Sequence, residues 1–322
     1  MMFHPRPRFF SRALSASNAP DDLRLAILRT VLYADIFDYP LTLVEIHRYL
    51  IGYRASVDEV TAVIQTDGLA GWLSSHAGYY TLRERPAIVA TRRERERGAA
   101  RLWRQARAWA GRLAALPFVR MVAVTGALSM NNAPADDDID LLIVTAPGRV
   151  WLSRALCVAL VRLARLAGVR LCPNYLLATA ALVQDQQDLY IAHELAQMVP
   201  LAGHALYAEM RAANAWTRRF LPQADQPPRI EPDLAPRGWR LHLQRLGERL
   251  LGGRLGDRLE AWERARKQRK FASAARASAA AQLDADRVKG HFDDHGRRVL
   301  AAYHERLCAQ WGRVPGESGR DD

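Results

Sequence analysis

The stretch Val124-Thr-Gly-Ala-Leu-Ser-Met-Asn-Asn-Ala-Pro-Ala-Asp-Asp-Asp-Ile-Asp-Leu-Leu-Ile-Val144 joins two apolar segments through a glycine turn and an acidic loop. Residues 119–125 and 139–145 are short apolar runs rich in valine, isoleucine and leucine, which predict two buried β-strands. Beyond them, Pro147-Gly148 precedes a helical pattern, and residues 169–178 predict a third strand. The order strand, turn, short helix, strand, helix, strand indicates a compact α/β unit.

Two carboxylates stand out on the second predicted strand. Asp138 and Asp140 are two residues apart, so we expect both on one face, with Ile139, Leu142 and Val144 packed into the core on the opposite face. Two adjacent carboxylates repel each other and are costly to bury as an isolated pair. A divalent cation between them removes that cost, and Mg²⁺ prefers a few carboxylates, waters and substrate phosphates.

A glycine turn precedes this acidic pair. Because Gly126 has no side chain, a triphosphate can approach the backbone there. The short helix predicted directly after it begins with free amide groups, which attract anions. The turn and the carboxylates together predict a site for a phosphate ligand and its metal ion.

The spacing of these features resembles the polymerase-beta-type nucleotidyltransferase superfamily. That signature is an apolar residue, glycine, glycine or serine, a gap of about ten residues, and then Asp-apolar-Asp-apolar. Here Thr125-Gly126-Ala127 is followed by residues 128–137 and then by Asp138-Ile139-Asp140-Leu141. The wider chain also resembles uncharacterised bacterial members that join a winged helix to such a domain, with Cys172-Pro-Asn-Tyr-Leu-Leu177 and Ala192-His-Glu-Leu-Ala-Gln-Met198 among the similar segments.

The resemblance implies an α+β fold: a mixed-sheet nucleotidyltransferase core with an N-terminal winged helix-turn-helix and a helical C-terminal region. It implies Mg²⁺-dependent transfer of a nucleoside monophosphate from a nucleoside triphosphate to an acceptor hydroxyl, with release of pyrophosphate. Asp138 and Asp140 would hold two Mg²⁺ ions, and Gly126, Ala127 and Ser129 would bind the triphosphate. The sequence leaves the acceptor open.

The chain departs from the family pattern at two places. Ala127 stands where the family often has serine, and the hydroxyl of Ser129 is the substitute that the sequence offers. Active members usually have a third carboxylate, but no Asp or Glu lies between Asp140 and Asp185, and the third strand offers only Asn174.

The third carboxylate must therefore come from later in the chain. We expect Glu194, beside His193 on a predicted helix, to be the general base, ahead of Asp188 and Asp185. The other interpretation is that His193 and Glu194 form a polar helix edge with no catalytic role. The missing acid also favours an alternative function, that of a catalytically weak or inactive nucleotide-binding regulatory protein.

The N-terminal part predicts three helices followed by a β-hairpin, the layout of a winged helix, over residues 23–86. Thr42 and Glu45 have capping-box spacing at the start of the second helix. The third helix, from Ser56, carries Asp58 and Glu59 but no basic residue, which disfavours DNA binding because phosphates repel it. A packing or dimerisation module is the favoured interpretation, and the second of these alternatives would give a homodimer.

Composition sets the remaining expectations. The 322 residues are 49% hydrophobic and 25% charged, as in globular proteins, and no apolar stretch is long enough to span a membrane. The three cysteines form no CxxC pair and are expected to be reduced, in a cytoplasmic protein. The net charge of +12 is concentrated in patches on predicted helices, and all but three of the 46 basic residues are arginine.

The predicted organisation has five parts. They are a disordered tail (1–22), the winged-helix module (23–86), a basic connecting helix (87–117), the nucleotidyltransferase core (118–200), and a helical C-terminal region (201–322) with a Pro-rich linker at 222–238.

Overall fold

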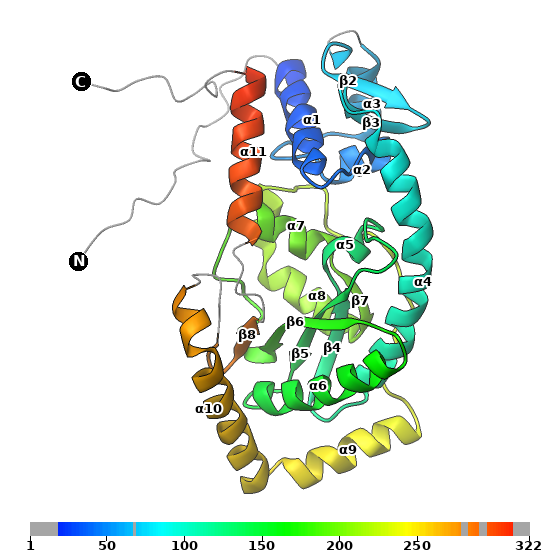
Figure 1. Cartoon of the computed structure of the whole chain (residues 1–322). Helices are drawn as coiled ribbons and strands as arrows, with labels where there is room; N and C mark the ends of the chain where they lie inside the picture. The colour runs from blue at the N-terminus through cyan, green and yellow to red at the C-terminus, as the bar shows by residue number, and fades with distance from the viewer. Residues whose placement is uncertain (1–18, 67–68, 278–282, 290–294, 312–322) are drawn as a thin grey trace, which may run out of the picture.

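The computed structural model describes residues 19–66, 69–277, 283–289 and 295–311 (Figure 1). Its N-terminal part has three helices and an antiparallel sheet with the strand order β1-β3-β2. These elements are α1 (Ala19–Asp35), β1 (Leu41–Thr42), α2 (Leu43–Arg48), α3 (Val57–Gln65), β2 (Leu73–His76) and β3 (Tyr79–Leu82). The predicted capping box of Thr42 and Glu45 is confirmed, and a second one joins Ser56 to Glu59.

A five-stranded mixed sheet forms the centre of the molecule, in the order β7-β4-β5-β6-β8. Its strands are β4 (Val119–Val124), β5 (Ile139–Thr145), β6 (Leu171–Ala178), β7 (Val199–Ala202) and β8 (Arg287–Lys289). β5 and β6 run parallel, whereas all other neighbouring pairs are antiparallel. The parallel pair is joined by a helix that crosses over one face, α6 (Val150–Leu166).

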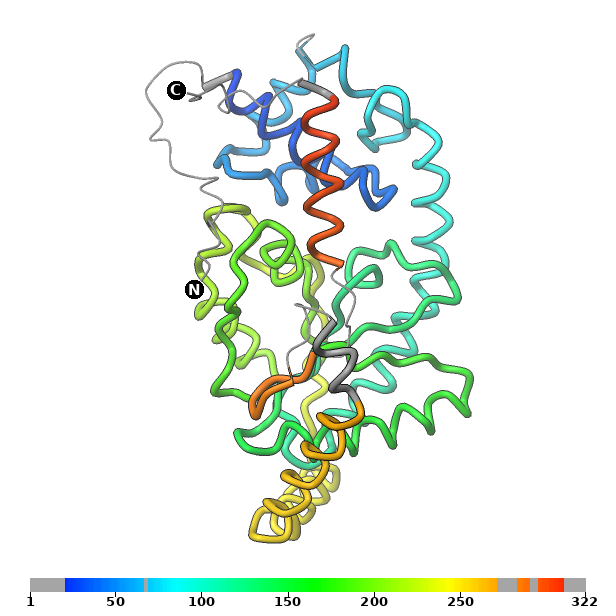
Figure 2. Tube along the Cα trace, turned by 60° about the vertical axis from the view of Figure 1, so that its left-hand side comes forward, coloured from blue at the N-terminus to red at the C-terminus, as the bar shows by residue number. Residues whose placement is uncertain are grey.

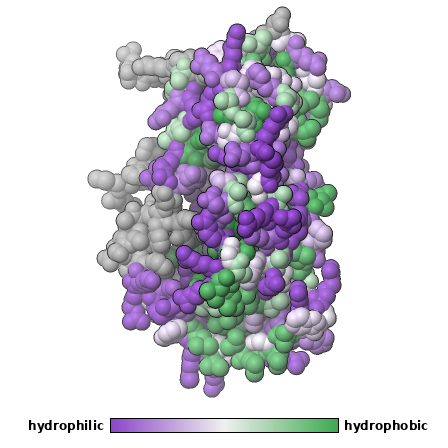
Figure 3. Space-filling model, turned by 45° about the vertical axis from the view of Figure 1, so that its right-hand side comes forward, coloured by the Kyte–Doolittle hydropathy of each residue, from purple (hydrophilic) through white to green (hydrophobic). Residues whose placement is uncertain are grey.

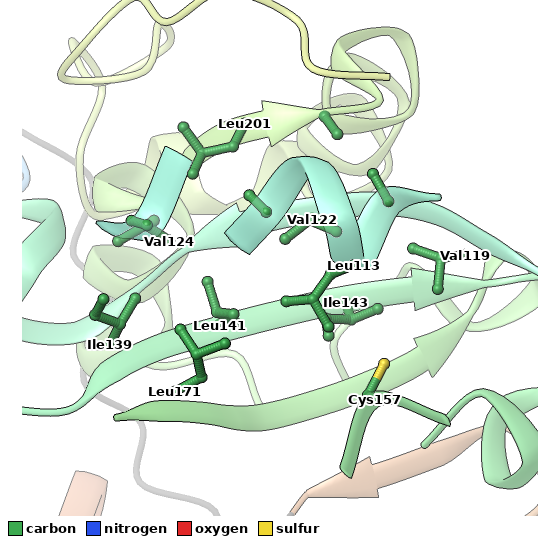
Figure 4. Close-up of a cluster of buried hydrophobic side chains, with 14 of the residues drawn as sticks. Leu113, Val119, Val122, Val124, Ile139, Leu141, Ile143, Cys157, Leu171 and Leu201 are labelled. Atoms are coloured by element: carbon green, nitrogen blue, oxygen red, sulfur yellow. The ribbon is translucent and has the colours of Figure 1, made fainter. Parts of the chain in front are cut away.

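Helices cover both faces of this sheet. On one face α4 (Ile88–Ala114) and α6 pack against Val122, Leu141 and Ile143 (Figure 4). The other face packs against α7 (Leu189–Gln197) and α8 (His204–Ala213). Short helices complete the core, namely α5 (Gly126–Ser129), η2 (Thr179–Ala181) and η3 (Ala215–Arg219).

Three further helices follow the core. α9 (Trp239–Leu251) and α10 (Arg254–Ala277) form the lower end of the molecule in Figure 1. α11 (His295–Trp311) returns to lie beside α1, as Figures 1 and 2 both show, and it also contacts α7. The last described helix thus packs against the first. Among the described helices, none has the length and apolar character needed to cross a membrane.

The structure confirms an α+β protein with a mixed sheet, and β4, β5 and β6 form where the sequence predicts strands. Two edge strands were missed. β7 lies inside a segment predicted as helix, and β8 lies in the region predicted to be helical throughout. Both strands have only three or four residues. Such a short run does not allow the alternating pattern of a strand to be distinguished from the periodicity of a helix.

Two further predictions concern the margins of the described residues. Residues 1–18 of the predicted tail lie outside them, while 19–22 form the first turn of α1. Residues 278–282, 290–294 and 312–322 of the predicted helical C-terminal region also lie outside.

Candidate functional site

A cavity of about 450 Å³ opens on the sheet face that carries Asp140. Its floor is formed by the ends of β4, β5 and β6, and α7 forms one wall. α1 and the residues around β1 form an adjoining wall, and the start of α11 also lines the cavity. Cavities of this size hold small organic ligands. The cavity is therefore assembled from segments that are distant in the sequence.

Gly126 and Asp140 meet on the floor of this cavity. The amide of Thr125 donates a hydrogen bond of 3.0 Å to the carbonyl of Asp140, which aligns the end of β4 with β5. Gly126 then turns the chain with φ +63°, a conformation that favours glycine. A β-carbon on Gly126 would lie 2.6 Å from Oδ2 of Asp140, closer than atoms approach each other. The glycine is required for the carboxylate to lie against the turn.

Strand alternation corrects one prediction about β5. Ile139, Leu141 and Ile143 pack under α4 and α6, whereas Leu142 and Val144 lie in the core on the same face as Asp140. The prediction that Leu142 and Val144 oppose Asp140 is therefore wrong, because residues two apart share a face.

Asp138 lies apart from the cavity. Its Oδ1 accepts an ion pair of 3.0 Å from Nε of Arg170, and 54% of each side chain is exposed. The cavity lining includes Asp140 but not Asp138. The two carboxylates predicted to act together therefore have different surroundings, and the guanidinium of Arg170 occupies the place beside Asp138 where a cation would bind.

The two other predicted triphosphate ligands also differ from each other. Ala127 lines the cavity. Ser129 is buried, and its hydroxyl donates a hydrogen bond of 2.7 Å to the carbonyl of Gly126, within the single turn of α5. The hydroxyl stabilises the glycine turn, and Ser129 does not line the cavity.

Glu194 lines the same cavity as Asp140, although 54 residues separate them in the sequence. Burial raises the pKa of Glu194 to about 7, and the negative charge of Asp140 adds to this, while Lys289 opposes it. The carboxyl group is thus close enough to Asp140 to sense its charge. A group with a pKa near 7 is suited to accept a proton at neutral pH.

Cys172 holds Asp140 from the neighbouring strand. The two residues are register partners on β5 and β6. Burial raises the pKa of the Cys172 thiol to about 12, as do the charge of Asp140 and a hydrogen bond to it. The thiol is therefore protonated and donates to the carboxylate, which fixes its orientation.

Asn174 lies at an irregularity in the pairing of the same two strands. Leu141 pairs with Pro173 and Leu142 pairs with Tyr175, so Asn174 is the extra residue of a β-bulge. Bulges commonly redirect a side chain beside an active site. Asn174 lines the cavity, and its Oδ1 is buried with no hydrogen-bond partner. A buried acceptor without a donor indicates that a ligand belongs there.

These donors can be tested against Mg²⁺. Among the described residues, no three His, Cys, Asp or Glu side chains converge to form a complete metal site. However, Mg²⁺ takes one or two protein carboxylates and completes its shell with water and substrate phosphates. Asp140, Glu194 and the unsatisfied oxygen of Asn174 line one cavity and supply oxygen only. This set fits a magnesium ion that binds together with a phosphate ligand.

An aromatic wall faces the carboxylates. The ring of His193 on α7 stacks on Tyr33 of α1, with centroids 4.0 Å apart and an angle of 15°. Tyr49 lies 6.0 Å from the same imidazole. Burial lowers the pKa of His193 to about 4, so the ring is neutral, and its Nδ1 bonds to the carbonyl of Leu189. The stacked faces of Tyr33 and His193 cover each other and both residues are buried, so the stack forms a rigid, uncharged part of the cavity lining.

Two cationic residues from the C-terminal segments also line the cavity. Lys289 lies on β8, and Arg298 lies on α11. They bring positive charge to a site whose floor carries carboxylates, which suits a ligand with phosphate groups. Sequence reasoning missed both, although Lys289 is one of three lysines in an arginine-rich chain, and that rarity was the available signal.

Hydrogen bonds tie the N-terminal part to the loop beside the site. Tyr39 donates to the carbonyl of Met130 (3.0 Å) and to Glu45 (2.7 Å). Arg92 of α4 then holds Glu45 through two hydrogen bonds of 2.7 and 2.8 Å. The wall formed by the residues around β1 is therefore anchored to the segment that follows Gly126.

Comparison with known proteins adds nothing to this geometry. No protein-family model, curated protein or solved structure matches the chain.

Proposed function

We propose that the protein is a Mg²⁺-dependent nucleotidyltransferase that moves a nucleoside monophosphate from a nucleoside triphosphate to an acceptor hydroxyl. The observation that carries this proposal is the contact of Gly126 with Asp140 on the floor of a cavity that Glu194 also lines. A side-chain-free turn against a carboxylate leaves room for a phosphate chain and its counterion in the same place. The resemblance of residues 124–144 to the polymerase-beta-type signature supports the same reaction.

Each part of the cavity has a role in this reaction. Lys289 and Arg298 would bind the phosphates of the nucleotide, and the uncharged lining formed by Tyr33 and His193 would border its base. Asp140, with Asn174 as a neutral oxygen ligand, would hold Mg²⁺. When bound, the ion would neutralise charge on the phosphates in the transition state. Asp138 would join it only after release from Arg170.

Glu194 would move the proton. The acceptor oxygen forms a bond to the α-phosphorus, the bond from that phosphorus to the bridging oxygen breaks, and pyrophosphate leaves with the electron pair. The hydroxyl proton passes to the Glu194 carboxylate. Its pKa of about 7 places it near the optimum for this work at neutral pH.

The N-terminal part would act as a winged helix that builds the site and not as a reader of DNA. Three helices precede the β2-β3 hairpin, with the short strand β1 between the first two helices, and α1 supplies Tyr33 to the cavity wall. The helix that would enter a DNA groove, α3, exposes Asp58 and Glu59. This module therefore fits a role in nucleotide or acceptor recognition.

A nucleotide-binding regulatory protein is the second candidate. It is favoured by the ion pair of Asp138 with Arg170, which removes one carboxylate from the metal site. In that case triphosphate binds, but no monophosphate is transferred.

The test combines binding with turnover. Affinity for a non-hydrolysable triphosphate is measured with and without Mg²⁺, and pyrophosphate release is followed with each of the four nucleoside triphosphates. Wild type should bind with Mg²⁺, and Asp140→Ala should lose that dependence. Binding without pyrophosphate release, across a panel of hydroxyl acceptors, supports the regulatory role. Absence of binding by wild type refutes both.

A further inference from the structure

Helix α9 presents an apolar stripe to solvent. Trp239, Leu243, Leu246 and Leu250 are 68%, 55%, 52% and 66% exposed. Their spacing of four, three and four residues places them within an arc of about 60° around the helix. Figure 3 shows apolar surface at the lower end of the molecule, where α9 lies in Figure 1. Singly exposed leucines are ordinary, but four in line on one helix mark an interaction surface.

The inner face of α9 is polar, which is the reverse of an ordinary surface helix. The side-chain amide of Gln244 is buried and donates to the carbonyls of Ala114, Leu116 and Val119, at 3.0 to 3.1 Å. Glu248 accepts hydrogen bonds from the amide of Phe118 (2.9 Å) and from Arg120 (2.7 Å).

These bonds fix the rotation of α9. Gly247 lies so close to Pro117 that a β-carbon there would be 2.5 Å from the proline ring. Turning the leucines inward would break the bonds of Gln244 and leave three buried carbonyls without that donor. The stripe therefore faces outward because of how the helix is anchored.

Basic residues flank the stripe on both sides. At 100° per residue, Arg240 lies on one side and Arg245 and Arg249 on the other. The only acid of α9, Glu248, is turned inward and paired with Arg120.

The acids of the described part of α10 are also engaged with the core or with arginines. Asp257 pairs with Arg149, Glu260 accepts from the amides that begin α6, and Glu263 pairs with Arg266. The outward face of α9 is thus apolar at its centre and cationic at its edges.

We propose that α9 docks onto the surface of an anionic phospholipid membrane. A helix that lies in the membrane interface needs a stripe of leucine and tryptophan to enter the acyl boundary and basic residues beside it to meet the headgroups. Trp239 and the three leucines supply the first, and the flanking arginines supply the second. The helix lies along the membrane plane and does not cross it.

Charge decides against a second copy of the chain as the occupant. Two α9 helices packed through their stripes would bring the arginine flanks of one copy against those of the other. The acid needed to offset this repulsion, Glu248, is already bonded to Arg120. An anionic lipid surface has the opposite charge, so it attracts each of the arginines that flank the stripe.

The test uses the full-length protein and co-sedimentation with vesicles. Vesicles of phosphatidylcholine alone are compared with mixed phosphatidylcholine and phosphatidylglycerol vesicles. We expect binding to the mixed vesicles, weakened by salt. The double variant Leu243→Ser, Leu246→Ser should bind at least about tenfold more weakly, because two apolar side chains no longer leave water. Its thermal stability should match wild type, since both leucines are exposed.

A matched control distinguishes binding through α9 from nonspecific adsorption through any exposed leucine. Leu166 on α6 is 86% exposed, so Leu166→Ser removes an equally accessible leucine elsewhere and should leave vesicle binding unchanged. Absence of binding to the mixed vesicles, or equal binding by the double variant, overturns the proposal. So does a wild-type dimer in sedimentation velocity that the double variant abolishes, because a second copy would then cover the stripe.

Discussion

Oδ2 of Asp140 lies 2.6 Å from the point that a β-carbon on Gly126 would occupy. The turn and the carboxylate therefore both favour glycine at position 126, because any other residue would be strained there and would displace the Asp140 carboxylate. The hydrogen bond from Thr125 fixes the backbone of Asp140, and the thiol of Cys172 bonds its carboxylate, so the carboxylate cannot move aside without losing the bond to Cys172. A substitution at position 126 should therefore impair ligand binding more than it lowers the stability of the fold.

We expect Gly126→Ala to abolish Mg²⁺-dependent triphosphate binding and to lower the free energy of unfolding by about 1–3 kcal/mol, because φ is +63° and the methyl group meets Asp140. Gly148→Ala is the matched control. Gly148 has φ +65° but no atom within 4 Å, so this change should cost about 1–2 kcal/mol and leave binding intact. Calorimetric titration of both variants measures triphosphate binding, and urea unfolding measures their stability. Equal binding by both would refute the site.

Glu194→Gln tests the proton acceptor. The amide keeps the size of the side chain but cannot take up a proton, so turnover should fall by about 10²- to 10⁴-fold. Triphosphate affinity should change little, because the phosphates are expected at Lys289 and Arg298. Single-turnover rates and binding constants measured on the same preparations separate the two effects. Unchanged turnover would make Glu194 a structural residue of the cavity wall.

Arg170→Met tests whether Asp138 can join the metal site. The pair is half-exposed, so it is worth no more than about 1 kcal/mol, and its removal should lower the half-saturating Mg²⁺ concentration by at most about fivefold. Arg165→Met, on the last turn of α6, is the control and should have no effect. If Mg²⁺ dependence is identical in Arg170→Met and wild type, Asp138 takes no part in metal binding.

The sequence predicts the centre of the site much better than its walls. Gly126 and Asp140 are close in the sequence and lie at the ends of two paired strands, so the sequence predicts that they meet in one place. Tyr33, Lys289 and Arg298 reach the cavity only through packing of α1, β8 and α11, and no periodicity reports such contacts. The same reason explains Arg170, since a half-exposed ion pair has no signature in the sequence.

The acidic face of α3 leads to a prediction about DNA. Ala62 is exposed on this helix, and Asp58 and Glu59 share its surface. If α3 does not enter a groove, Ala62→Glu should bind duplex DNA with the affinity of wild type. Any residual binding should instead depend on the basic helix α4, so Arg104→Glu should weaken it. Fluorescence anisotropy over a range of salt measures both. A marked loss of affinity for Ala62→Glu would show that α3 contacts DNA.

The ion pair between the buried Glu231 and the partly exposed Arg107 gives a prediction for acid stability. Arg107 donates hydrogen bonds of 2.7 and 2.8 Å to the Glu231 carboxylate, and these bonds hold the pKa of Glu231 below its ordinary value. A lowered acid pKa stabilises the fold above the unfolded pKa of about 4.3, and this stabilisation is lost as the pH falls through the folded value. Glu231→Gln should therefore be less stable than wild type at pH 7, and the difference should shrink as the pH falls below about 4. Urea unfolding between neutral and acid pH measures this. Arg107→Met should also lower the stability at pH 7, by less than removal of both partners would, because Arg229 still pairs with the Glu231 carboxylate. A difference that stays constant over the whole range would show that the pair contributes through packing and not through its charge.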